Sequence, residues 1–175
     1  MSTRRQDAMT GYRRILWPTD FSPLAKAALA HIPKLAAGSR GELVIFHVLP
    51  SVAAYAYPDT AWLPWDRIDQ ANRAAGERGL QRLEAQIKRS RPDLRIHGVL
   101  ATGVAFEQIV QAARRLKCDL IVLATHGRTG LKHVLMGSVA ENVVRRAPCP
   151  VLTVRPSRFR SVAKPGRTSR KRGEA

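Results

Sequence analysis

Short apolar runs alternate with stretches in which apolar residues recur at helical spacing, and this alternation constrains the fold most strongly. The run from Glu42 to Leu49, ELVIFHVL, is almost continuously apolar. Such a run is typical of a parallel strand that is buried on both faces. Further strand candidates lie at 15–18, 94–100, 120–123 and 150–154. The order strand–helix–strand, repeated along the chain, predicts a parallel sheet with helices on both faces and right-handed crossovers.

The first helical stretch follows the segment PTDFS. Either Ser22 or Asp20 can cap this helix, and Pro23 suits its first turn. Pro33 should kink or shorten the helix, because proline cannot donate the helical hydrogen bond. Gly38 marks its end.

Two further helices and an edge strand are predicted from periodicity. Residues 94–100 alternate apolar with polar, as in a half-exposed strand at the edge of a sheet. The clearest amphipathic helix carries apolar residues from Phe106 to Leu116. In the long helix before it, the predicted buried side consists of Ile68, Ala71, Ala75, Leu83 and Ile87.

The chain's length and composition fit one globular domain. It has 175 residues, no apolar run near the roughly 20 residues that span a bilayer, and no apolar segment at its start. Its two cysteines, Cys118 and Cys149, have no metal-ligand spacing. We expect a cytoplasmic protein with a flexible segment 1–12, a folded domain 13–155 and a disordered basic tail 156–175.

The net charge of +17 is unusual, and its highest density lies in the tail. Residues 155–175 contain eight Lys or Arg and one Glu. Such a tail can contact nucleic acid or anionic lipid through counterion release. It can also be a solubilising extension without a partner, and this second interpretation is preferred because charge runs are weak motifs.

Ligands of open parallel sheets bind beyond the carboxyl ends of the strands, where the strand order reverses. This rule selects the loop after the first strand, at Thr19–Asp20, and the loop 124–137. In the second loop Gly127 and Gly130 permit tight turns, and Gly137-Ser138 opens a helix whose first N–H groups are unpaired. The loop is either a tight turn or a cradle for phosphate.

Asp20 has two possible roles. Its carboxylate can accept from a ribose hydroxyl or hold a divalent cation that bridges phosphates, or it can cap the following helix. Stronger catalytic signals are missing, since the chain has no Walker-type loop, no G-x-G-x-x-G after the first strand and no G-x-S-x-G. His126 and His133 lie seven apart without further ligands to complete a metal site.

The stretches ILWPTDFSPLAKAALAH and ATHGRTGLKHVLMGSVAENVVRRAPCPVLTVRP closely resemble the universal stress protein family. The resemblance covers about 14–155. It rests on the motif Gly, two residues, Gly, nine residues, then Gly-Ser or Gly-Thr, which here places Ala124 at the first glycine, Gly127 at the second and Gly137-Ser138 at the end. The resemblance implies a five-stranded, Rossmann-like parallel sheet of the adenine nucleotide alpha hydrolase-like type.

The resemblance also implies a binding site for ATP or a related adenine nucleotide, possibly with Mg²⁺, and a homodimer built through Val151–Val154. Thr19 and Asp20 would meet the nucleoside, and Val48 would contact adenine through its main chain. Gly127, Gly137, Ser138 and Val139 would hold phosphate and ribose. The nucleotide-binding candidates are therefore Thr19, Asp20, Val48, Ala124, His126, Gly127, Gly137, Ser138 and Val139.

Ala124 departs from the motif by adding a methyl group where the backbone should approach the nucleotide. The cost is small if its φ is negative, and roughly 1 kcal/mol if φ is positive. Because the other motif positions are kept, we expect binding.

Three functions follow as hypotheses. The first is a stress-response protein that binds nucleotide as a sensor, with slow or absent hydrolysis. The second is a nucleotide-free interaction protein whose basic ends bind nucleic acid, and the third is a slow ATPase with a metal held by Asp20. The aromatic segment 51–66 is either a lid, a partner surface or locally packed.

Overall fold

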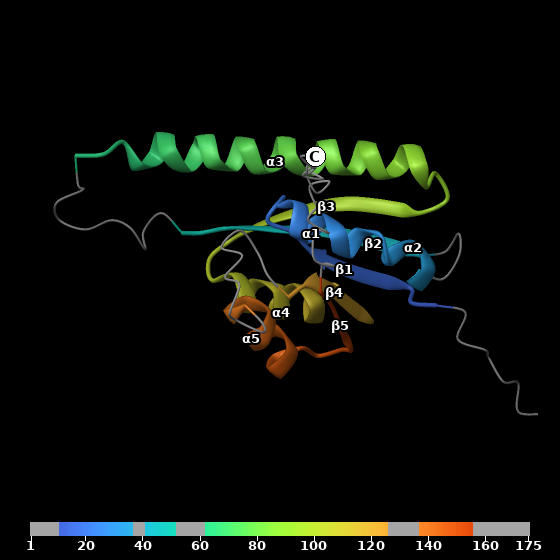
Figure 1. Cartoon of the computed structure of the whole chain (residues 1–175). Helices are drawn as coiled ribbons and strands as arrows, with labels where there is room; N and C mark the ends of the chain where they lie inside the picture. Colours follow the sequence, from blue (N-terminus) through green and yellow to red (C-terminus); the bar gives the residue numbers. More distant parts are fainter. Residues whose placement is uncertain (1–10, 37–40, 52–61, 126–136, 156–175) are drawn as a thin grey trace, which may run out of the picture.

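The described part of the chain forms one five-stranded parallel sheet, in the order β3-β2-β1-β4-β5. The structure is a computed structural model, and it describes residues 11–36, 41–51, 62–125 and 137–155. Figure 1 shows the sheet at the centre of the molecule. The predicted parallel sheet is confirmed, and its strands are β1 (Arg14–Pro18), β2 (Glu42–Leu49), β3 (Arg95–Thr102), β4 (Leu120–Ala124) and β5 (Val151–Val154).

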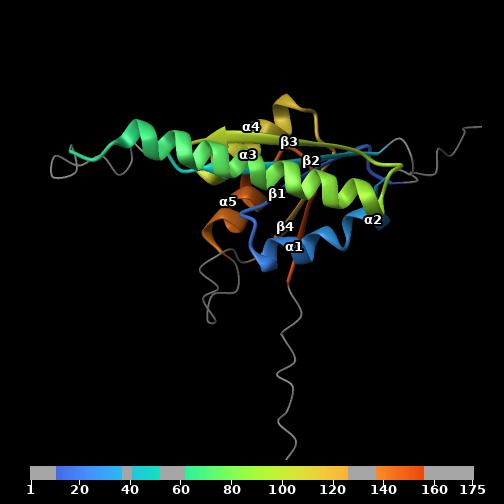
Figure 2. The ribbon, with the colours of Figure 1, turned by 90° about the horizontal axis from the view of Figure 1, so that it is seen from above.

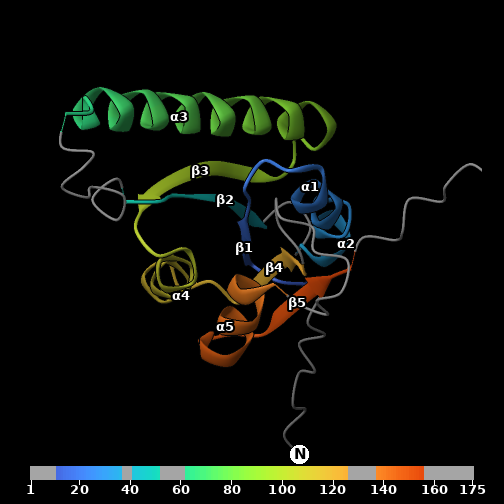
Figure 3. The same cartoon turned by 60° about the vertical axis from the view of Figure 1, so that its left-hand side comes forward.

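Helices cover both faces of this sheet. One face carries α1 (Pro23–Leu29), α2 (Ile32–Leu35) and α3 (Trp65–Ser90), whereas α4 (Ala105–Arg115) and α5 (Ser138–Arg146) cover the other. Figure 3, turned from the view of Figure 1, separates the two layers. Between β1 and β4 the direction of winding reverses, which places the expected ligand cleft at the carboxyl ends of these two strands.

The side chains of β2 are buried on both faces of the sheet, as its continuous apolar run predicts. Leu43 and Ile45 pack beneath α1, α2 and α3, whereas Val44 and Phe46 pack beneath α4 and α5. Trp17 of β1 is fully buried, and its Nε1–H donates to the Ala25 carbonyl at 3.2 Å. This hydrogen bond satisfies the indole and fixes α1 against the first strand.

The first helical stretch is divided, as Pro33 predicts. α1 ends at Leu29, and the short α2 begins at Ile32 with Pro33 in its first turn. At the start of α1, Ser22 is the N-cap, and its Oγ accepts from the Ala25 N–H at 3.1 Å. Of the two candidates for this cap, the structure therefore selects Ser22.

The predicted buried side of α3 is partly wrong. Ala71 and Ala75 are exposed, and the buried residues of the helix begin only at Gly76. The first three turns extend past the strands they would cover, which Figure 2 shows from above. Glycine carries no apolar side chain, so a periodicity search does not register a face whose buried residues are Gly76, Gly79, Leu80, Leu83 and Ile87.

A polar cluster joins the strands at the opposite end from the cleft. The Asp119 carboxylate accepts from the main-chain N–H groups of Arg13 and Arg14 at 2.8 and 2.9 Å. The Arg14 Nε–H donates to Glu42 at 2.7 Å, and His97 lies 3.3 Å from the same carboxylate. These contacts tie β1, β2, β3 and the start of β4 together at their amino ends.

Two cysteines lie under the α4–α5 layer as free thiols. Cys118 is buried, which raises the pKa of its thiol to about 12. Cys149 is half-buried, and burial raises the pKa of its thiol as well. Within the described ranges no helix is both long and apolar enough to cross a membrane.

Candidate functional site

A cavity of about 390 Å³ opens at the carboxyl ends of β1 and β4, at the reversal in strand order. Its volume falls in the usual range for small-molecule sites. It lies on the α4–α5 side, and β1, β2, β4 and the starts of α4 and α5 all contribute to its wall. The lining comprises Pro18, Thr19, Asp20, Ala25, Phe46, His47, Val48, Ala105, Ile109, Leu123, Ala124, Thr125, Gly137, Ser138, Val139 and Ala140.

The loop after β1 holds Thr19 and Asp20 in a tight turn. The Thr19 Oγ1 accepts from the Phe21 N–H at 3.1 Å, and the Asp20 Oδ1 accepts from the Ser22 N–H at 3.0 Å. Phe21 itself has φ +63°, a left-handed conformation that an aromatic residue rarely adopts. Because such strain persists only where surrounding contacts enforce it, the neighbouring structure holds this loop in its conformation.

The carboxylate of Asp20 is held by the turn through one of its two oxygens. One carboxylate oxygen is used by the Ser22 N–H, and the helix is capped by Ser22 rather than by Asp20. The described part of the chain supplies no hydrogen bond to the second oxygen, Oδ2. Asp20 is therefore not the N-cap of α1, and its Oδ2 is chemically able to accept from a hydroxyl.

The carboxyl end of β2 presents main-chain groups to the same cavity. In β2, the Phe46 carbonyl accepts from the Thr19 N–H at 2.8 Å, so alternate residues of this strand direct their main-chain groups toward β1. β1 pairs only as far as Pro18 with Phe46. The N–H and C=O of Val48 thus point past the end of β1, where no described residue hydrogen-bonds them.

β4 ends in Ala124, the residue that departs from the family motif. Ala124 pairs with Val154 in the regular strand, and the only described non-glycine residues with positive φ are Phe21 and Lys117. The methyl group of Ala124 therefore costs little backbone strain, as expected for negative φ. It lines the cavity beside Thr125.

The start of α5 supplies hydrogen-bond donors to the cavity. The Gly137 N–H is not one of them, since it donates to the Thr125 carbonyl at 2.7 Å. The first intrahelical bond runs from Glu141 N–H to Gly137 C=O, and no side chain caps the helix. Among the described residues, the N–H groups of Ser138, Val139 and Ala140 therefore have no hydrogen-bond partner, and they lie at the positive end of the helix dipole.

Seven of the nine candidates from the sequence meet at this cavity: Thr19, Asp20, Val48, Ala124, Gly137, Ser138 and Val139. The other two, His126 and Gly127, lie outside the described residues, as do Gly130 and the possible metal ligand His133. Sequence reasoning missed the apolar floor, which Phe46, Ala105 and Ile109 form. These residues carry no motif, and only Phe46 and Ile109 fall in the apolar patterns of the predicted strand and helix.

No preformed metal centre is present in the part of the chain that the structure describes, because no group of three or more His, Cys, Asp or Glu residues could hold an ion there. Asp20 is the single carboxylate among the cavity's described lining residues. One carboxylate fits a Mg²⁺ ion only when phosphate oxygens and water supply most of its ligands.

Comparison with known proteins agrees with this architecture. Universal stress protein MJ0531 of Methanocaldococcus jannaschii is 32% identical over 144 residues, which cover 82% of each chain. The structure of universal stress protein UspA from Lactobacillus plantarum superposes with a TM-score of 0.70 at 27% identity, covering 83% of this chain and 99% of that one. A universal stress protein solved in complex with cAMP gives a TM-score of 0.59 at 25% identity, covering 84% and 99%.

The sequence match extends over nearly all of the described fold. Residues 11–155 match the Universal stress protein family, a range that contains every strand and helix of the sheet and all of the cavity's lining residues. The chain therefore belongs to the universal stress protein family.

Proposed function

We propose that the cavity binds ATP or a related adenine nucleotide, and that the occupied and empty protein differ in a regulatory output. The observation that carries this proposal is the order of polar groups around one apolar cavity. Val48 offers a main-chain donor and acceptor at one end, and Asp20 lies in the wall. At the other end, α5 offers three N–H groups that no described residue hydrogen-bonds.

The nucleobase fits the Val48 end on chemical grounds. The Watson–Crick edge of adenine presents an acceptor next to a donor, which the N–H and C=O of one residue can meet together. Guanine presents a donor where adenine has an acceptor, so the same pair would be mismatched. The apolar side chains of Phe46 and Ile109 supply a surface against which a flat base can pack.

The phosphate fits the start of α5. The open N–H groups of Ser138, Val139 and Ala140 and the helix dipole favour an anion there, and the Ser138 hydroxyl adds a further donor. Asp20 would repel a phosphate and accept from a ribose hydroxyl, so the carboxylate orients the nucleotide between its two ends. A Mg²⁺ ion carried by the phosphates would add a contact to Asp20.

Binding without rapid hydrolysis is the activity we propose. Among the described lining residues, Asp20 and His47 are the ionisable groups, and the His47 Nδ1 is occupied by the Thr19 carbonyl at 2.7 Å. Phosphoryl transfer usually relies on cationic and metal groups around the reacting phosphate. Support for the ligand class comes from the related universal stress protein in complex with cAMP.

We further propose a homodimer through β5, which is an edge strand of the sheet. The Pro150 carbonyl accepts from the Ile121 N–H, and the Val154 carbonyl accepts from the Thr125 N–H. Residues 150, 152 and 154 therefore direct their main-chain groups toward β4. Val151 and Thr153 therefore present N–H and C=O groups outward. An edge of this kind pairs readily with a second copy.

Calorimetric titration of the full chain tests the proposal. ATP, AMP and cAMP are compared with adenosine and with GTP, in buffer with and without Mg²⁺. We expect adenine nucleotides to bind more tightly than adenosine, and GTP to bind weakest. Equal binding of ATP and GTP, or no heat with any adenine compound at millimolar concentration, would overturn it.

A further inference from the structure

The outward side of α3 carries a straight row of arginine and alanine residues. At steps of three and four residues, which keep one line along a helix, the row reads Arg67, Ala71, Ala74, Arg78, Arg82, Ala85 and Arg89. All are exposed except Ala74, which is half-buried. We refer to these seven residues as the arginine row.

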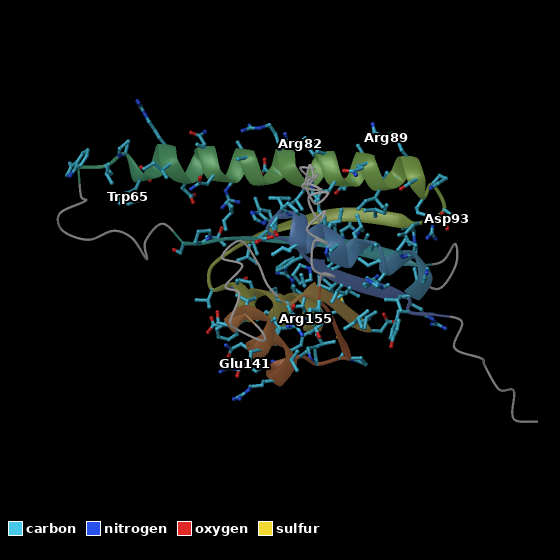
Figure 4. All side chains as sticks on the ribbon, viewed as in Figure 1. Trp65, Arg82, Arg89, Asp93, Glu141 and Arg155 are labelled. Carbon is cyan, nitrogen blue, oxygen red and sulfur yellow. The ribbon has the colours of Figure 1, made fainter. Side chains whose placement is uncertain are left out.

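The row lies opposite the side by which α3 packs on the sheet. Leu80, Leu83 and Ile87 are buried against β2 and β3, so the row faces away from the domain. Figure 4 labels Arg82 and Arg89, whose side chains extend away from the sheet. The helix has 26 residues and is about 39 Å long.

The four arginines of the row have no acidic partner in the described chain. None of them takes part in the ion pairs there, which involve Arg14, Arg91, His97 and Arg145. The carboxylates of α3, at Asp66, Asp69, Glu77 and Glu84, lie off the row, and Glu84 turns inward to accept from the Gly98 N–H. Charge on this helix is therefore separated, with its outermost line purely cationic.

The geometry points to a polyanionic partner, and we propose that the arginine row binds the phosphate backbone of a duplex nucleic acid without sequence preference. One guanidinium group can bind two oxygens of a phosphate at once. The small alanines between the arginines let the sugar-phosphate backbone approach the helix closely. A row of this length reaches several successive phosphates. The chain's net charge of +17 would draw a polyanion to it.

Two other occupants fit the row less well. A second copy that pairs symmetrically through the row would bring four further arginines against these four, and the two sets would repel one another. A membrane-surface helix needs large apolar side chains on its buried line, and the row contains none. This proposal is independent of nucleotide binding, because the row shares no residue with the cavity.

Fluorescence anisotropy with labelled duplex DNA and duplex RNA tests the row, using the full chain. The test variant is Arg78→Gln/Arg82→Gln, and the matched control is Arg114→Gln/Arg115→Gln, which removes the same charge from exposed positions on α4 across the sheet. Glutamine has nearly the helix propensity of arginine, so both variants should fold. Arg78→Lys/Arg82→Lys keeps the charge and should retain most of the binding.

We expect the test variant to weaken binding about tenfold at 0.1 M salt and to lower the slope of log K against log salt by about 1.8, because each phosphate contact contributes about 0.9. The control should change both values much less. Equal losses in the two glutamine variants would overturn the proposal in favour of net charge alone, and no loss in either would place binding elsewhere. Tighter binding to phosphatidylglycerol vesicles than to either duplex would overturn it as well.

Discussion

The ring of Phe21 lies where a side chain at Gly79 would have to be. A Cβ built on Gly79 would come within 2.6 Å of the Phe21 Cζ, so α3 can approach the loop after β1 only through a glycine. On its other side the Phe21 ring contacts the His47 ring at 4.2 Å between centroids. The long helix thereby holds the loop that carries Thr19 and Asp20.

Gly79→Ala should destabilise the protein, although alanine is the better helix former. Overpacking costs typically about 1–3 kcal/mol, which exceeds the gain of about 1 kcal/mol in helix propensity. The matched control is Gly76→Ala, where the added methyl group meets the flexible end of Leu100 at 3.0 Å. Urea denaturation should give the lower midpoint for Gly79→Ala.

Gly79→Ala should also weaken nucleotide binding, because a shift of Phe21 would displace the neighbouring Asp20. Adding Phe21→Leu to Gly79→Ala removes the clash and should recover part of the stability. The account fails if Gly79→Ala is as stable as Gly76→Ala, or if the second substitution lowers stability further.

Asp20→Asn and Ser22→Ala should separate binding from stability. Asparagine keeps the oxygen that accepts from the Ser22 N–H but replaces Oδ2 with an NH2 group, which cannot accept from a ribose hydroxyl. Affinity for adenine nucleotides should therefore fall about tenfold with stability unchanged. Ser22→Ala removes the N-cap of α1 and should cost about 1 kcal/mol without changing affinity. Calorimetric titration measures the affinity and urea denaturation the stability of both variants. A loss of stability in Asp20→Asn, or a loss of affinity in Ser22→Ala, would contradict the roles given to the two residues.

Ser138→Pro should remove one phosphate donor and leave the helix intact. Ser138 is the first residue of α5, where proline is favoured, and Gly137 already has the extended conformation that precedes proline, with φ −69° and ψ 151°. Ser138→Ala is the control, because it removes the hydroxyl but keeps the N–H. We expect AMP to bind about tenfold more weakly to the proline variant than to the alanine variant. Adenosine should not distinguish them, and a loss shared by adenosine would argue against a phosphate at this position.

Thr153→Pro should yield a monomer. The Thr153 N–H points outward from β5, so proline removes no hydrogen bond to β4 but blocks pairing with a second strand. Light scattering after size-exclusion chromatography should give a dimer for the wild-type chain and a monomer for the variant. A variant that remains dimeric would place the interface elsewhere.

Cys118 should make the protein sensitive to alkali. Burial, followed by the effect of Cys149, raises the pKa of its thiol in the folded state from 9.0 to about 12. Stability from this group is fully present below pH 9 and is lost as pH rises toward 12, because only the unfolded chain then releases the proton. Between pH 8 and pH 10 the free energy of unfolding should fall by roughly 1 kcal/mol more in the wild-type chain than in Cys118→Ala. An equal fall in the free energy of unfolding of the two proteins would contradict the raised pKa of the Cys118 thiol.

The sequence was sufficient for the strands and for most helix positions, because their apolar spacing is regular. β2 and α4 follow their patterns closely, and Pro33 divides the first helical stretch as predicted. The prediction for α3 is wrong at Ala71 and Ala75, because the buried side of this helix begins at Gly76 and Gly79. Glycines that allow close packing of the helix carry no apolar side chain, so the sequence pattern does not show them.

The candidate site could be located from the sequence, but its detail could not. The strand-end rule and the motif select Thr19, Asp20 and Ser138, and the family resemblance adds Val48. All four residues line the cavity. That Ser22 rather than Asp20 caps α1, and that the Gly137 N–H is used by Thr125, depends on local hydrogen bonds. Spacing along the chain does not determine which of several nearby acceptors a donor reaches.

Thr125 receives the Gly137 N–H at its carbonyl, and its own N–H donates to the Val154 carbonyl at 3.0 Å. One residue thus links the anion-facing helix to the outermost strand. If nucleotide binding orders the start of α5 and dimerisation orders β5, each event lowers the free-energy cost of the other. The affinity for nucleotide would then weaken as the protein is diluted. At the same nucleotide concentration, a cell with much of this protein would have a larger fraction of it occupied than a cell with little.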